Sequence, residues 1–132
     1  MRADELINKL TKTLNYPQYK VARLAGLDPH TLSNVKEQLV SDLTPRTRNR
    51  LGALFQVVRD LGPLPSEALL EILQRQVFED ESGRRDSVVS ALQQEKYPIE
   101  VLLQIAEMAN QEYRTRWVSN MPDMRDALSL SA

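Results

Sequence analysis

The chain has no cysteine among its 132 residues. This absence excludes disulfide frameworks, thiolate zinc sites and cysteine nucleophiles, and it fits a cytoplasmic protein. Glycine is scarce, with four residues, and aromatic residues make up 5% of the chain, a composition that favours helices over a β-sandwich. The longest apolar run is the five residues Leu51–Phe55, counting Gly52, whereas a membrane span needs about 20. We therefore expect no membrane association.

Catalytic motifs are also missing. The sequence has one histidine, no glycine-rich phosphate loop, and neither an H-E-x-x-H nor a G-x-S-x-G motif. Carboxylate pairs such as Glu67 and Glu71 have ordinary helix-surface spacing. The run Glu79–Glu81 fits a solvated turn better than a cation site, because no further ligands accompany it. We expect neither an enzyme, nor a metal site, nor a cofactor.

What the sequence does contain is an uneven distribution of charge. The total of 17 Lys/Arg and 18 Asp/Glu gives a net charge of -1. Residues 1–62 carry ten basic and six acidic residues, a sum of +4, and residues 63–132 carry seven and twelve, a sum of -5. The change falls at Gly62-Pro63-Leu64-Pro65, where two prolines interrupt helix formation. This predicts a basic domain, 1–62, followed by an acidic partner or dimerisation module, 63–132.

Apolar residues recur at helical spacing almost throughout, and no segment shows the alternation of a strand. The fold class is therefore predicted to be all-α. Stop signals at Asn15-Tyr16-Pro17 and a Thr44-Pro45 cap place several boundaries. Helices are expected over 3–14, 18–25 and 29–39, from 45 to about 61, from a Ser66 cap through Val77, around 88–92, and from about 98 to 119.

The segment 19–35 predicts a helix-turn-helix. Ala22 is small enough for a close helix crossing, and Gly26 tolerates the positive φ of a tight turn. Apolar residues at helical spacing fill the wedge between the two helices; these are Val21, Leu24, Leu27, Leu32 and Val35. The second helix is left with a small polar face that can enter a major groove.

This segment resembles a known family. Val21–Ser33, VARLAGLDPHTLS, resembles the DNA-binding headpiece of lactose-repressor-type bacterial regulators, V-A-x-x-A-G-V-S-x-x-T-V-S. Leu43–Leu51 is similar to that family's next helix, V-S-x-x-T-R-x-x-V, and the Ala/Gly spacing is shared with the wider phage-repressor-like class. The chain departs from the family in its additional leading helix and in having Pro63 and Pro65 in place of a hinge helix. It is also too short for the family's sugar-binding domain, so no inducer pocket of that type is implied.

The resemblance implies a set of DNA-binding residues. The base-reading positions fall on Pro29 and His30, and the groove-facing pair that follows falls on Ser33 and Asn34. Because Pro29 has no side-chain donor, readout is expected to shift to His30, Thr31 and Asn34, of which asparagine can pair bidentately with adenine. Thr31 and Ser33 also suit phosphate contacts. The expected interface is completed by Gln18, Tyr19 and Lys36.

Three arginines at the start of the fourth helix, Arg46, Arg48 and Arg50, are predicted to contact phosphates. Arg46 and Arg50 share a helix face, whereas Arg48 points elsewhere, so the three cannot all contact one strand. Gly52 within the same helix is expected to mark close helix packing.

The last long helix offers a candidate interface for a second copy or another protein. Its predicted contact residues are Leu102, Ile105, Ala109, Tyr113 and Trp117. Together these features predict a sequence-specific, homodimeric transcriptional regulator of double-stranded DNA, most simply a repressor. Two alternatives stay open: an antitoxin-like protein whose acidic half neutralises a partner and which autoregulates its own promoter, and a protein-interaction adaptor that has lost DNA binding.

Overall fold

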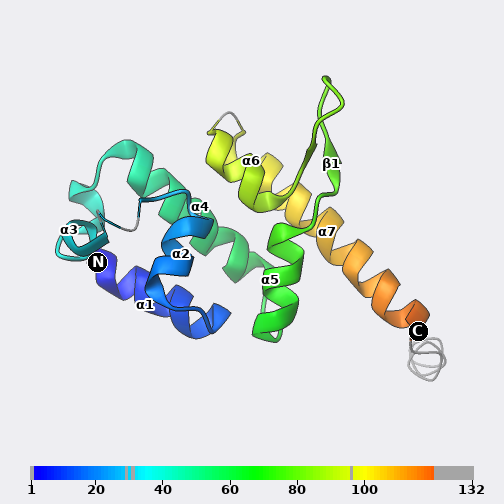
Figure 1. The fold of residues 1–132 in the computed structure, drawn as a ribbon, viewed down its shortest axis with the longest axis horizontal. Helices are drawn as coiled ribbons and strands as arrows, with labels where there is room; N and C mark the ends of the chain where they lie inside the picture. The colour runs from blue at the N-terminus through cyan, green and yellow to red at the C-terminus, as the bar shows by residue number, and fades with distance from the viewer. Residues whose placement is uncertain (1, 29, 31, 96, 121–132) are drawn as a thin grey trace.

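The structure, a computed structural model, describes residues 2–28, 30, 32–95 and 97–120, and only the backbone of 117–120. These residues form a mostly helical fold with one small hairpin (Figure 1). The prediction of a mainly helical protein is confirmed. In chain order the elements are α1 (Ala3–Leu14), α2 (Gln18–Leu24), α3 (Leu32–Lys36), the 3-10 helix η2 (Val40–Asp42), α4 (Pro45–Leu61), α5 (Ser66–Gln74), β1 (Phe78–Glu79), β2 (Arg85–Asp86), α6 (Val88–Gln94) and α7 (Ile99–Asn120).

The hairpin corrects the expectation that the chain has no strand. β1 and β2 pair antiparallel, with Phe78 opposite Asp86. Asp80 organises the turn, because its Oδ1 accepts hydrogen bonds from the backbone N–H groups of Ser82 and Arg84, each at 2.9 Å. Two-residue strands are too short to show an alternating pattern, so periodicity could not reveal them.

α1 and α2 have nearly the predicted bounds. The apolar face of α1 is completely buried; its residues are Leu6, Ile7, Leu10 and Leu14. Asn15 ends α1 in the left-handed conformation, with φ of 52°, which is a common helix ending. The stop signal at 15–17 is thereby confirmed.

The third helix is much shorter than the predicted 29–39. α3 has five residues, and Pro29 and Thr31 lie outside the described residues. The backbone after α3 pairs with the start of α1 and does not continue the helix. Ala3 N–H donates to Gln38 O at 2.9 Å, and Leu39 forms a β-bridge with Arg2. Long-range backbone pairing has therefore overridden local helix propensity.

α4 begins as predicted, and Thr44 Oγ1 accepts a hydrogen bond from Thr47 N–H. The role expected for Gly52 is wrong, however. A Cβ placed on Gly52 would meet no described atom within 4 Å, so no neighbouring helix requires a glycine there.

α5 differs from its prediction at both ends. Pro65, not Ser66, occupies the N-cap, and no side-chain cap bond forms there. Val77 lies beyond the helix and donates its backbone N–H to Asp86 O at 3.1 Å. The predicted end of α5 therefore pairs with the hairpin and is not helical.

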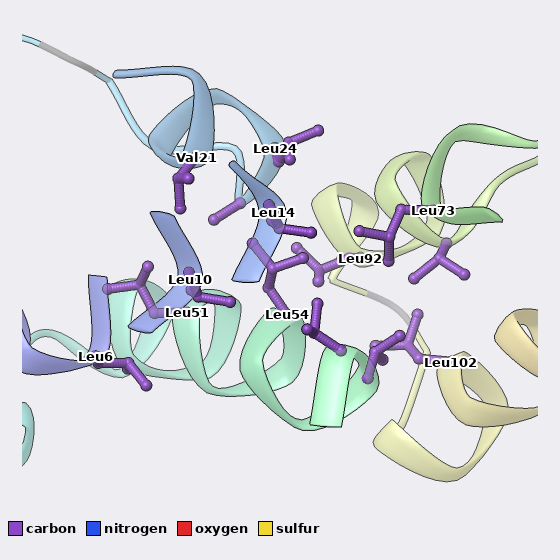
Figure 2. Close-up of a cluster of buried hydrophobic side chains, with 14 of the residues drawn as sticks. Leu6, Leu10, Leu14, Val21, Leu24, Leu51, Leu54, Leu73, Leu92 and Leu102 are labelled. Atoms are coloured by element: carbon purple, nitrogen blue, oxygen red, sulfur yellow. The ribbon is translucent and has the colours of Figure 1, made fainter. Parts of the chain in front are cut away.

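The core is continuous across the proline-rich segment 62–65. One hydrophobic cluster draws buried residues from each of the seven α-helices. Figure 2 shows Leu54 of α4 gathered with Leu73, Leu92 and Leu102 of α5, α6 and α7. The two predicted modules thus share a single core, and the segment between them is a turn from α4 into α5. No helix in the described part of the chain is long and apolar enough to cross a membrane.

The open surroundings of Gly52 predict that Gly52→Ala stabilises the protein. Glycine inside a helix destabilises it by about 0.5–1 kcal/mol relative to alanine, and the added methyl group meets no steric obstacle. Chemical denaturation of the full chain should therefore show an unfolding free energy higher by about that amount. The matched control is Gly83→Ala, where φ is 85° and the same substitution should destabilise. Loss of stability in Gly52→Ala would show that α4 needs the glycine.

Candidate nucleic-acid interface

The segment from α2 to α3 packs as its apolar spacing predicts. Val21, Leu24 and Val35 are buried, and Leu27 and Leu32 pack against the same cluster while half-buried. The polar residues Ser33 and Asn34 are exposed on α3. α3 and the start of α4 lie at the end of the molecule that holds the N-terminus, away from the far end of α7 (Figure 1). The exposed face of α3 is therefore open to a partner.

Gly26 makes the turn between α2 and α3 with φ of 75°, as predicted. The turn is closed by Leu27 N–H, which donates to Ala22 O at 2.8 Å. A Cβ at Gly26 would lie 2.8 Å from Arg50 Nη1 and 2.9 Å from Gln93 Cγ. The site thus needs glycine both for its backbone conformation and for the close approach of these two side chains.

Arg50 is the residue that approaches this turn, and its predicted phosphate contact must be corrected. Its side chain is only 9% exposed. Nη1 donates to Gly26 O, Nη2 to Gln93 O at 3.1 Å, and Nε to Glu95 Oε1 at 3.1 Å. The guanidinium therefore joins the α2–α3 turn to the end of α6 and is not available to DNA.

Gln93 strengthens the same junction. Its Nε2 donates to the carbonyls of Arg23 and Leu24, at 3.0 and 3.2 Å. These carbonyls belong to the last turn of α2, where backbone acceptors have no partner within the helix. Sequence periodicity could not identify Gln93, because its partners lie about 70 residues earlier in the chain.

The other two predicted arginines remain accessible. Arg46 is 68% exposed, and its Nε lies 3.3 Å from Glu95 Oε2. Because Arg46 and Arg50 pair with the two oxygens of one carboxylate, their predicted common face is confirmed. Arg48 is also exposed and points elsewhere, with Nη1 3.5 Å from Ser41 O. Two exposed cations thus lie at the start of α4.

Gln18 and Lys36 connect the helices around α3. Lys36 Nζ donates to Gln18 Oε1 at 2.9 Å, and Gln18 Nε2 donates to Asn8 Oδ1 at 3.1 Å. These contacts link α1, α2 and the end of α3. Tyr19 is 46% exposed, and the guanidinium of Arg23 lies over its ring, 5.5 Å from the centroid. Arg23 is an exposed cation at this surface that the sequence prediction omitted.

His30 is the remaining predicted base-contacting residue within the described part of the chain. It is exposed, and its backbone N–H donates to Asp28 Oδ1 at 2.9 Å. This bond shows that Asp28 helps to shape the entry into α3, as a cap residue does. No group of three His, Cys, Asp or Glu in the described residues could hold a metal ion.

The predicted dimer residues on α7 require a correction. Leu102, Ile105 and Ala109 are buried in the chain's own core, with exposures of 4%, 1% and 0%. They cannot contact a second copy unless that core opens. Tyr113 is half-buried, and the side chain of Trp117 lies outside the described residues. A partner interface would have to use another surface of the chain.

Comparisons of the chain with protein-family models, with curated proteins and with solved structures find no match.

The contacts of Arg50 predict that its substitution lowers the unfolding free energy far more than substitution of Arg48 on the same helix. Arg50→Gln should lower the unfolding free energy by about 2–4 kcal/mol, because it removes a buried cation and leaves the carbonyls of Gly26 and Gln93 without their donor. Arg48→Gln is the control and should change stability by less than about 0.5 kcal/mol, since that side chain is exposed. Equal stabilities of the two variants in urea denaturation would contradict a structural role for Arg50.

Proposed function

We propose that the protein is a sequence-specific DNA-binding regulator whose α2, Gly26 turn and α3 form a helix-turn-helix. The observation that carries this proposal is the exposed polar pair Ser33 and Asn34 on α3, with Val35 buried behind it. Two exposed arginines at the start of α4 accompany it. Such a surface has the two components that DNA recognition needs, namely side chains for base edges and cations for phosphates.

The dimensions of α3 limit how it could read DNA. Five residues give a helix of about 7.5 Å, so only one turn would enter the major groove. Recognition helices use mainly their N-terminal residues for base contacts, and this favours Ser33 and Asn34. Asn34 is the better base reader, because its amide can both donate to and accept from adenine.

Phosphate contacts are proposed for Arg46 and Arg48. Arg46 would have to leave Glu95, but an exposed ion pair contributes only about 0–1 kcal/mol. A phosphate can therefore replace the carboxylate at little cost. Arg48 has a single long contact to a backbone carbonyl, so it is also free to move toward a phosphate.

A homodimer remains part of the proposal. One short recognition helix makes few contacts, and regulators of this kind usually bind two half-sites about 34 Å apart as a dimer. Occupying a promoter in this way would repress transcription. The adaptor alternative differs because it would enrich no duplex in a DNA selection. The antitoxin-like alternative also binds its own promoter, and copurification with a basic protein partner would distinguish it from the proposed function.

Selection of bound sequences from a random duplex pool by the full chain should enrich two related, inverted half-sites. On the enriched duplex, Asn34→Ala should weaken binding by about 1–3 kcal/mol because one bidentate base contact is lost, while binding to unrelated duplex stays nearly unchanged. Gln104→Ala, an exposed amide on α7, is the control and should bind as the unmodified chain does. Equal weakening of Asn34→Ala on all sequences would refute base readout, and no enrichment would favour a protein partner.

The phosphate contacts predict a change in salt dependence. Each neutralised phosphate contributes about 0.9 to the slope of log affinity against log salt concentration. Because each copy of the proposed homodimer carries both arginines, the double variant Arg46→Gln/Arg48→Gln should reduce the slope by about 1.8 per bound copy, or about 3.6 for the dimer. Arg114→Gln/Arg116→Gln removes two exposed cations of α7 and should leave the slope as it was. An unchanged slope in the first double variant would remove both arginines from the interface.

A further inference from the structure

A second surface lies between α1 and α4, where the structure has a pocket of about 500 Å³. Ligand pockets for small molecules usually occupy about 300–1,000 Å³, so the pocket has the size for one small molecule. The residues that line it come from the C-terminal halves of the two helices and the turn after α4. They are Lys9, Leu10, Lys12, Thr13, Phe55, Val58, Arg59, Gly62 and Pro63.

The lining combines an apolar interior with a cationic rim. Leu10 and Val58 are buried and belong to the core cluster, and the ring of Phe55 is half-buried beside them. Lys9, Lys12 and Arg59 are exposed. None of the lining residues in the described chain carries a negative charge. Three cations from two helices therefore converge on one apolar opening.

Helix electrostatics accounts for only part of this arrangement. Lys12 and Arg59 lie in the last turns of α1 and α4, where cations interact favourably with the helix dipole. Lys9 lies a turn earlier and shares a face with Lys12. The dipole does not explain why Lys9 joins them at the edge of an apolar pocket.

Two other cavities in the described part of the chain differ from it in their charge. The cavity between α4 and the start of α7 is lined by Arg48 and Arg50 together with Glu95, and Arg50 pairs with that carboxylate. The cavity at the hairpin is lined by Glu79, Asp80 and Glu81 together with Phe78 and Tyr97. Of these three cavities, the α1–α4 pocket alone is lined by three cations and by no acidic residue.

We propose that the α1–α4 pocket binds a small amphipathic anion, an aliphatic chain that ends in a carboxylate. The chain would lie over Leu10, Phe55 and Val58, which are apolar, and the head group would lie among the cations of the rim. A protein segment fits less well, because a specific interface normally buries more than about 1,000 Å² and the pocket is confined to two helix ends. The proposal is independent of DNA binding.

The test is calorimetric titration of the full chain with decanoate below its micelle concentration. Decanol and decyltrimethylammonium carry the same alkyl chain with a neutral and a positive head group. Decanoate should bind one to one and at least about tenfold more tightly than either. Equal affinity for the three probes would overturn the proposed role of the rim. Binding to anionic phosphatidylglycerol vesicles without binding of decanoate would also overturn the proposal.

Substitutions locate the bound probe. Lys9→Gln, Lys12→Gln and Arg59→Gln should each weaken decanoate binding by about fivefold, the loss of one exposed charge contact. Thr13→Phe adds bulk to the pocket wall and should prevent binding without removing a charge. Arg116→Gln, on the distant part of α7, should bind decanoate as the unmodified chain does. All five positions are exposed, so the circular dichroism spectra of the variants should match that of the unmodified chain. The proposed site would be contradicted by unaltered decanoate binding in the four pocket variants, Lys9→Gln, Lys12→Gln, Arg59→Gln and Thr13→Phe.

Discussion

The buried guanidinium of Arg50 is the interaction on which the arrangement of the helices depends. A guanidinium keeps its charge inside a protein, so its burial is tolerated only when its donors meet acceptors. Arg50 meets acceptors from two distant segments, with Gly26 O on one side and Gln93 O and Glu95 on the other. α4 is thereby fixed at once to the α2–α3 turn and to the end of α6.

This junction shows that the two oppositely charged halves of the chain are not structurally separate. The +4 and -5 halves suggest two separable modules, yet a cation of the first half is neutralised by Glu95 of the second, and both halves contribute to one core. A chain cut after residue 62 would leave Arg50 without Gln93 and Glu95, and the carbonyls at the end of α2 without the amide of Gln93. The orientation of α3 is therefore a property of the whole chain.

The features that could be predicted from the sequence are local ones. The Thr44 cap, the stop at Asn15 and the positive φ of Gly26 each follow from a few neighbouring residues. Burial of Arg50 could not be predicted, because its partners are 24 to 45 residues away and an arginine near a helix start ordinarily reads as a surface cation. The end of α3 was missed for the same reason, since pairing with Arg2 and Ala3 decides it.

The positive charges of the first half do not form a single patch. Arg50 is buried, Arg46 and Arg48 lie at the start of α4, and the pocket cations lie toward the C-terminal ends of α1 and α4. α4 alone is 17 residues long, or about 25 Å, so a duplex bound at α3 would not use all of these charges. Two arginines release few counterions, and one copy would therefore bind DNA weakly. For the proposed regulator, tight binding would therefore need a second copy. Because Leu102 and Ile105 are buried, that copy would have to pack elsewhere than on the predicted contact residues of α7.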